Sequence, residues 1–175
     1  MRLRRAPVAA SRLVVFCVLL LSSCAGYHIG PIKPTYMKDI KTVAVPPFKN
    51  DTLIPRIEVL VAGSIIKAIQ LDGTYDVASE DNADAILEGT IRTLIRTPAR
   101  SLIGNVLVST EYTLTLTLEI KVVKRSTNAI LDRRLFAGQT SFFVGQDINQ
   151  EERQALPLAV EDAARSAVST LSEGW

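Results

Sequence analysis

A run of alternating residues between positions 106 and 122 constrains the fold of this chain more than any other feature. One parity of the run is apolar, with Thr110 as its one break, and the other parity is polar and rich in threonine from Ser109 to Lys121. A period of two residues is typical of a half-buried β-strand, which at about 3.4 Å per residue extends some 50 Å here. Such a strand predicts a sheet with one buried face and one face open to water or to a polar partner. The apolar set is Val106, Val108, Tyr112, Leu114, Leu116, Leu118, Ile120 and Val122.

Three shorter elements are expected before this strand. Residues 40–45 form an apolar, β-branched run that Pro46 and Pro47 stop, as expected of a strand, and residues 48–52 are a polar connection. Apolar residues then recur at helical spacing from Pro55 until Gly73, and residues 75–78 resemble a second brief strand. A strand, a helix and a strand in this order favour a right-handed parallel crossover.

Two more strands are expected around the alternating run. Residues 87–96 alternate, and residues 98–105 form the turn that leads into the run. After a second turn at residues 126–128, residues 130–143 form another long strand, whose irregular alternation near residues 132–134 predicts a β-bulge.

A second helix is expected at the carboxyl end of the chain. Asn149 and Glu152 resemble a capping box, and Pro157 is expected to mark the first helical turn. The apolar stripe is rich in alanine, so the helix should pack close to the sheet. It consists of Leu156, Val160, Ala163, Ala164, Ala167 and Leu171. The prediction is an α+β domain, residues 40–175, with two helices on one face of a mixed, mainly antiparallel sheet of about four to five strands, two of them long.

The amino-terminal segment has the pattern of a secretory leader. Residues 1–23 combine four arginines with the apolar run 13–21, which is shorter than the roughly 20 residues of a spanning helix. Leu21-Ser22-Ser23-Cys24 resembles the bacterial lipobox, which implies cleavage before Cys24 and acylation of its thiol. The alternative is a soluble secreted protein with one spare cysteine. Ala25 stands where enterobacterial inner-membrane retention uses Asp, which favours an outer-membrane lipoprotein on the periplasmic face. Residues 24–39 would then be its tether.

Charge and residue inventory narrow the function classes. The chain has 20 basic and 18 acidic residues, and loss of the leader's four arginines leaves 16 basic residues against 18 acidic ones. This balance argues against nucleic-acid binding. His28 is the only histidine and lies on the tether, which excludes a serine triad, and no metal-ligand spacing or phosphate-binding loop occurs. The number of acidic residues alone does not exclude a pair of catalytic carboxylates like that of a glycosidase. The expectation is nevertheless a protein without enzymatic activity or cofactor.

A group of basic residues is the candidate binding site. Its members are expected to gather toward one end if the two long strands pair as a hairpin around residues 98–105, with Arg92 and Arg96 on the same outer face. One interpretation is a solubilising surface, and the other is a binding patch for the anionic head of a lipid, since arginine pairs with phosphate bidentately. The group consists of Arg92, Arg96, Arg100, Lys121, Lys124 and Arg125.

Several stretches of the chain resemble the LptE family of lipopolysaccharide-assembly lipoproteins: residues 24–28, 40–52, 55–58 and 85–91. The resemblance implies a helix pair on a mixed sheet, seated inside the β-barrel of the translocon LptD. There the protein would act as a plug and an assembly aid for inserting lipopolysaccharide into the outer leaflet. The family binds lipopolysaccharide through basic residues, but no motif transfers those positions to this chain. A polar outer surface such as the threonine-rich strand face suits a wet barrel lumen.

A second resemblance leaves another class open. Residues 43–48, the following helix and residues 83–89 are also similar to outer-membrane lipoproteins of the CsgG and LpoB kind. A peptidoglycan-synthase activator of the LpoB kind would need a long linker to cross the periplasm, and about 15 residues are too few. A secretion-pore subunit of the CsgG kind would need a hairpin long enough to cross the membrane, and the hairpin here is long enough.

Overall fold

The computed structural model describes residues 33–102, 108–145 and 147–174, without the side chains of residues 100–102 and 108–110. These residues fall within one compact unit. Cys24, His28 and the leader lie outside the described residues. Within the described part of the chain, no helix is both long enough and apolar enough to cross a membrane. The elements in chain order are η2 (Thr35–Met37), β1 (Thr42–Ala44), β2 (Lys49–Asn50), α2 (Ile57–Asp72), β3 (Asp76–Val77), β4 (Ala85–Leu102), β5 (Val108–Lys124), β6 (Ala129–Phe143) and α3 (Ile148–Glu173).

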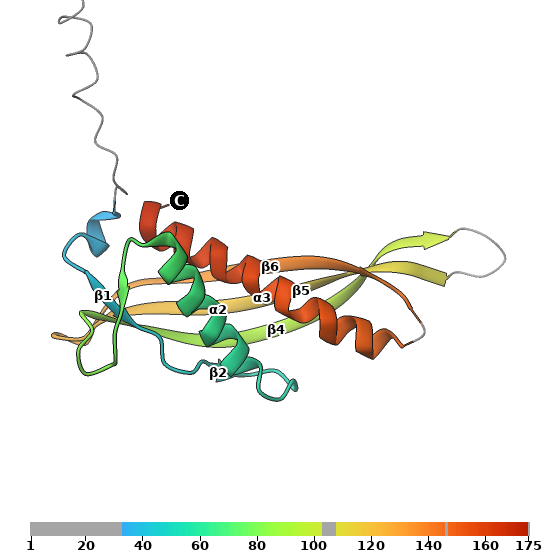
Figure 1. The fold of residues 1–175 in the computed structure, drawn as a ribbon, viewed down its shortest axis with the longest axis horizontal. Helices are drawn as coiled ribbons and strands as arrows, with labels where there is room; N and C mark the ends of the chain where they lie inside the picture. The colour runs from blue at the N-terminus through green and yellow to red at the C-terminus, as the bar shows by residue number, and fades with distance from the viewer. Residues whose placement is uncertain (1–32, 103–107, 146, 175) are drawn as a thin grey trace, which may run out of the picture. The chain divides into compact units, whose positions relative to one another are not determined.

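The strands form one mixed sheet in the order β3-β1-β4-β5-β6, with β2 also paired to β4 (Figure 1). β1 pairs in parallel with β3 and with β4, which confirms the parallel pairing expected for the first strand, helix and strand. β4, β5 and β6 are antiparallel. The predicted α+β class, with two helices and a mixed sheet, is confirmed. The sequence does not predict the two-residue strand β2. Residues 48–52 are all polar except Phe48, and a strand of two residues is too short to show an alternation of apolar and polar side chains.

The helices cover one face of the three long strands (Figure 1). On β5 this face holds five fully buried side chains, at the even positions from Leu114 to Val122, and the odd positions are half-buried. The alternation predicted for this strand is therefore confirmed in the described residues. Burying a side chain of this size contributes about 1.5–3 kcal/mol. We call the opposite side, which no described helix covers, the open face.

Helix α3 packs so closely on β6 that one position there has room only for glycine. A Cβ atom built on Gly138 would overlap the backbone of Ala159 and Ala163, so the alanine stripe allows the close contact that the sequence predicted. The carboxylate of Asp162 accepts a hydrogen bond from the backbone N–H of Gln139 at 3.0 Å. This hydrogen bond satisfies one backbone donor on the outer edge of β6.

The start of α3 differs from the prediction. Asp147 is the N-cap, since its carboxylate accepts hydrogen bonds from the N–H groups of Asn149 and Gln150, so the capping box at Asn149 and Glu152 is wrong. Pro157 lies inside the helix and does not begin it. An interior proline costs about 3 kcal/mol, and packing of the preceding turns, including the buried Ala155, outweighs that cost.

Part of the predicted tether belongs to the domain. Met37 is fully buried in the core, and Ile40 beside it is 1% exposed. Lys33 donates from Nζ to the carbonyl of Ile40 at 2.8 Å and lies 4.5 Å from the ring centre of Tyr75. The boundary of the domain at residue 40 is therefore too late, and the packed structure reaches back to Lys33. Between Cys24 and this point lie residues 25–32, fewer than the 15 that the sequence suggested.

Candidate functional site

The predicted basic group is not a single patch. β4 continues to Leu102, so residues 98–102, which were expected to lie in the hairpin turn, belong to the strand. Arg100 pairs with Glu111 near this turn, whereas Lys124 pairs with Ala85 at the other end of the same two strands. Thirteen residues of β5 separate the two levels, which is roughly 44 Å at 3.4 Å per residue. The clustering expected for the six residues is therefore wrong.

Arg92 and Arg96 lie on opposite faces of the sheet, contrary to the prediction. The pairing register shifts between Ile91 and Thr93, so Arg92 is an extra residue in the ladder with β5. Such a bulge reverses the facing of every later residue. Ile95 is consequently 51% exposed on the open face, and Arg96 pairs with Leu114 on the helix-covered face.

Three of the six residues lie away from Arg92: Arg96, Lys124 and Arg125. Arg96 binds the carboxylate of Glu152 on α3, and its guanidinium carbon lies 5.4 Å from the ring centre of Tyr112. Arg125 donates from Nε to the carbonyl of Ala83 at 2.7 Å. Lys124 ends β5 beside it. Arg96 thus ties α3 to the hairpin, and Arg125 ties the β5–β6 turn to the loop before β4.

The bulge places Arg92 at the centre of a charged group on the open face. Its Nε donates to the Glu119 carboxylate at 2.9 Å, and its Nη1 binds Asp51 at 3.0 Å. Arg133 on β6 lies 3.5 Å from the other oxygen of Glu119. Lys49 binds Asp51 at 3.0 Å, and the charge of Lys121 also acts on Glu119. We call these residues the open-face cluster: Lys49, Asp51, Arg92, Glu119, Lys121 and Arg133.

The outward side of the open-face cluster is positive. It contains four cations and two carboxylates, and the carboxylates are the more covered groups: the Glu119 side chain is 14% exposed, against 44% for Arg92 and 52% for Arg133. The hydrogen bond from Arg92 lowers the pKa of Glu119, and that from Lys49 lowers the pKa of Asp51. Both carboxylates therefore stay ionised and hold the guanidinium groups in place, while the remaining cationic charge faces solvent.

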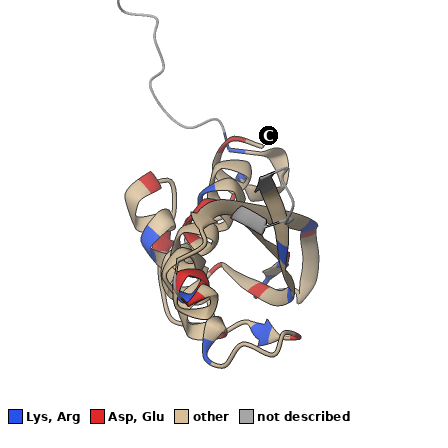
Figure 2. Cartoon of the chain, turned by 90° about the vertical axis from the view of Figure 1, so that its right-hand side faces the viewer, with Lys and Arg blue, Asp and Glu red and all other residues tan. Residues whose placement is uncertain are grey.

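Sequence reasoning found only two members of this cluster, Arg92 and Lys121. The sequence predicts a polar connection at Lys49 and an irregular strand at Arg133, and neither pattern indicates a binding residue. Their meeting depends on the cross-strand register, in which Lys121 lies opposite Arg133. The predicted bulge in β6 is confirmed, one residue before the expected range, because Val122 and Val123 pair with Asp132 and Ile130 and leave Leu131 unpaired. Figure 2 shows that basic and acidic residues alternate along the ribbon and are not segregated into separate parts of it.

A groove lies between α2 and α3. It has a volume of about 370 Å³, an apolar floor that includes Ala68 and Val168, and a mixed rim in which Lys67 binds Glu161 at 3.2 Å. No group of three or more metal-ligating side chains occurs in the described part of the chain. The groove contains no histidine or cysteine.

Comparison with protein families gives one match that covers most of the domain. The model of the LptE family, described as lipopolysaccharide-assembly, matches residues 40–171. The chain belongs to the LptE family. The match spans every described element from β1 to β6 and α3 as far as Leu171, and the family resemblance drawn from the sequence is confirmed. A comparison with curated protein sequences gives no match.

Solved structures with the same fold come from several bacteria. A DUF330 protein from Xanthomonas campestris aligns with a TM-score of 0.55 and 15% identity, covering 79% of this chain and 88% of that one. A minor lipoprotein from Acinetobacter baumannii gives 0.51 and 16%, covering 76% and 93%. A PelC dodecamer from Paraburkholderia phytofirmans gives 0.51 and 19%, covering 82% and 94%. At these identities the likeness of this LptE family member to the three proteins establishes its fold alone.

Proposed function

We propose that this LptE family member is an outer-membrane lipoprotein that plugs and helps to assemble an LptD-like β-barrel, through which lipopolysaccharide reaches the outer leaflet. The observation that carries the proposal is the family match over residues 40–171. Cleavage before Cys24 and acylation of its thiol would anchor the domain to the periplasmic face of the outer membrane through residues 25–32. At roughly 3.3 Å per residue, these eight residues reach about 26 Å, which keeps the domain beside the membrane. The proposal includes no catalytic step, cofactor or nucleic acid.

The proposal further assigns the open-face cluster to the phosphate groups of lipopolysaccharide. Arg92 and Arg133 converge on Glu119, and both are about half exposed, so each guanidinium keeps donors for an incoming anion. Lys121 adds a cation from the same face of β5. Charge-assisted hydrogen bonds to phosphate are roughly twice as strong as neutral ones. This cluster replaces the six-residue patch expected from the sequence.

Affinity purification of the full-length chain from detergent-solubilised outer membranes tests the partner. We expect a large β-barrel protein to co-purify in a one-to-one ratio. A homo-oligomeric ring without a barrel would contradict the proposal and favour a secretion pore of the CsgG kind. An intact-mass measurement on the same sample checks the anchor, because an unmodified Cys24 thiol or an uncleaved leader would contradict the lipoprotein assignment.

Binding of purified lipopolysaccharide tests the cluster. The triple variant Arg92→Gln, Lys121→Gln, Arg133→Gln should lose affinity by about tenfold or more, since one charge-assisted hydrogen bond is worth about 1.5–3 kcal/mol. The matched control is Lys67→Gln, Lys124→Gln, Arg165→Gln, which removes the same charge elsewhere on the domain. Equal affinities of the two triple variants would exclude the open-face cluster as the binding site and leave the barrel assignment intact.

A further inference from the structure

The open face contains a regular block of side chains without charge, between the open-face cluster and the hairpin turn. The register of β4, β5 and β6 arranges nine outward side chains in three rows of three. Six of them carry a hydroxyl group, and none is ionisable. The rows, which we call the threonine block, are Thr93-Thr117-Ala137, Ile95-Thr115-Gln139 and Thr97-Thr113-Ser141.

The lack of charge distinguishes this block from the other side of the domain. The outer surfaces of α2 and α3 carry Lys67, Glu161, Asp162 and Arg165, which form ion pairs at 3.2 and 3.8 Å. Surfaces of soluble proteins normally mix charges at about a quarter to a third of their positions. The centres of protein interfaces, in contrast, are depleted of charged residues and are surrounded by a polar rim. The threonine block has this composition, with the open-face cluster as its rim at one end.

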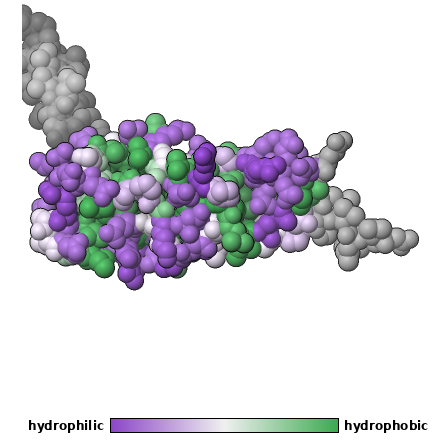
Figure 3. Space-filling view, turned by 90° about the horizontal axis from the view of Figure 1, so that it is seen from below, coloured by the Kyte–Doolittle hydropathy of each residue, from purple (hydrophilic) through white to green (hydrophobic). Residues whose placement is uncertain are grey.

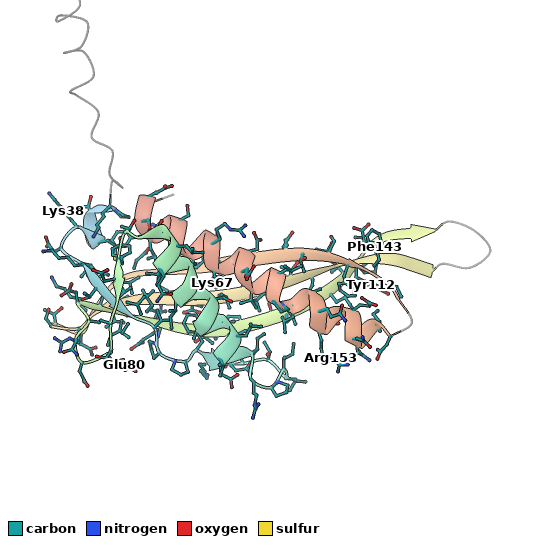
Figure 4. The ribbon with its side chains drawn as sticks, viewed as in Figure 1. Lys38, Lys67, Glu80, Tyr112, Phe143 and Arg153 are labelled. Carbon is teal, nitrogen blue, oxygen red and sulfur yellow. The ribbon has the colours of Figure 1, made fainter. Side chains whose placement is uncertain are left out.

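On β6, an exposed apolar side chain lies next to the block at each end. Leu135 pairs with Glu119 and is 65% exposed, and Phe143 pairs with Glu111 and is 67% exposed. Figure 4 shows Phe143 and Tyr112 near the hairpin, far from Lys38 and Glu80 at the other end of the strands. Figure 3, seen from below, shows apolar surface divided into separate areas by hydrophilic residues. These side chains would lose contact with water if a partner covered the open face.

The size of the block indicates what kind of partner fits it. Three rows about 6.8 Å apart on three strands about 4.8 Å apart cover roughly 300 Å². A stable pair of proteins buries about 800 Å² on each side, so the block is too small to hold two copies of this chain together. Its area suits one part of a larger interface, in which the partner also surrounds other parts of the domain. The inner wall of a β-barrel is such a surface, because it is polar and surrounds its contents.

We infer that the threonine block is the surface of this domain that lies against the inner wall of the barrel, and that the helices point away from that wall. The inference rests on the function proposed above, since it requires a barrel partner. Hydroxyl groups both donate and accept hydrogen bonds, so they can match the hydroxyl and amide side chains of a polar wall directly or through water. A sheet lying on the wall of a barrel also follows the usual face-to-face packing of two sheets.

Site-specific photo-crosslinking in native outer membranes tests the orientation. A photoreactive residue at Thr115 or Ala137 should crosslink the chain to the barrel protein, and the same residue at Gln70 or Gln154 on the exposed helix surfaces should do so at least several-fold less. Crosslinks mainly from Gln70 and Gln154, or crosslinks that join two copies of this chain, would overturn the inference. If the wild-type chain captures no barrel at all, the proposed function itself fails.

Introducing negative charge into the block provides a second test, with a control variant that adds negative charge elsewhere. The double variant Thr115→Glu, Gln139→Glu places two carboxylates side by side in the middle row of the block. It should lower the yield of co-purified barrel at least tenfold, whereas Gln70→Glu, Gln154→Glu, which adds the same charge to the helices, should leave the yield close to wild type. Thermal melting of each variant verifies that it is folded. A folded Thr115→Glu, Gln139→Glu variant with wild-type yield would overturn the inference.

Discussion

The two faces of β5 are built from neighbouring residues and have different physical roles. The even positions, such as Leu116, are fully buried under the helices, and the odd positions, such as Thr115, lie half-buried on the open face. The first set is selected for volume, since buried side chains must fill space at crystal-like density. The side chains of the second set are in contact with water and are available to bind a partner. Stability and binding can therefore be changed separately by substitutions one residue apart.

The largest contrast should come from truncating adjacent residues of β5. Leu116→Ala is expected to lower the free energy of unfolding by about 2–5 kcal/mol, because it removes buried methyl groups and leaves a cavity. Thr115→Ala and Thr117→Ala, on the open face, should change it by no more than about 0.5 kcal/mol. Urea denaturation measures all three. A loss of stability in the threonine variants as large as that in Leu116→Ala would break the comparison.

Adding volume to β6 should separate the two faces in the same way. Gly138→Val forces a side chain into the backbone of α3 at Ala159 and Ala163 and should cost about 1–3 kcal/mol or more. Ala137→Val adds volume one residue earlier, on the open face, and should be nearly neutral. The melting temperatures of the two variants give the comparison. Similar values would mean that α3 does not pack against β6 as described.

Removing the helix cap has a smaller expected effect. Asp147→Ala deletes the side chain that binds the N–H of Asn149 at 2.9 Å and should destabilise the domain by about 1 kcal/mol. Asn149→Ala, at the position that the sequence predicted as the cap, should have little effect. If Asn149→Ala proved the more destabilising variant, α3 would begin at the later residue.

The smallest effect should be the dependence of stability on pH at the open-face cluster. Folding lowers the pKa of Glu119 below its ordinary value of 4.5 and that of Asp51 below 3.8. Their contribution is therefore present above these ordinary values and is lost as pH falls through the lower folded values. Arg92→Gln should be slightly less stable than wild type at pH 7, and the difference should vanish in strong acid. A difference that persists unchanged in acid would mean that the ion pairs contribute nothing.

Local patterns in the sequence predicted most of the fold. The alternation along β5 identified its buried face, and Gly73 marked the end of α2, where it has a φ of 73° that favours glycine. The predictions were wrong where the local sequence is compatible with two structures and tertiary contacts determine which one forms. Both Asp147 and Asn149 can cap a helix, and packing of the first turns of α3 selects Asp147. Pro157 is a usual sign of a helix start, but the turns before it are held by Arg96 and the core.

The candidate site was harder to predict than the fold because it depends on one extra residue. The adjacent apolar residues Leu94 and Ile95 fit either face of a strand, so the sequence does not reveal the bulge at Arg92. Pairing with β5 determines it, since Thr93 lies opposite Thr117. That single shift moves Arg96 to the helix-covered face and leaves Arg92 beside Glu119. The distribution of charge over a sheet thus follows from register, which composition and periodicity do not specify.

A substitution scan along β5 tests the separation of the two faces most directly. Each residue from Thr113 to Leu118 is replaced by glutamate, and both the free energy of unfolding and the yield of co-purified barrel are measured for every variant. We expect the even positions to lose stability, and we expect Thr113→Glu, Thr115→Glu and Thr117→Glu to remain folded but to lose the barrel. If the yield follows stability alone and these three variants retain the barrel, the open face is not the binding surface.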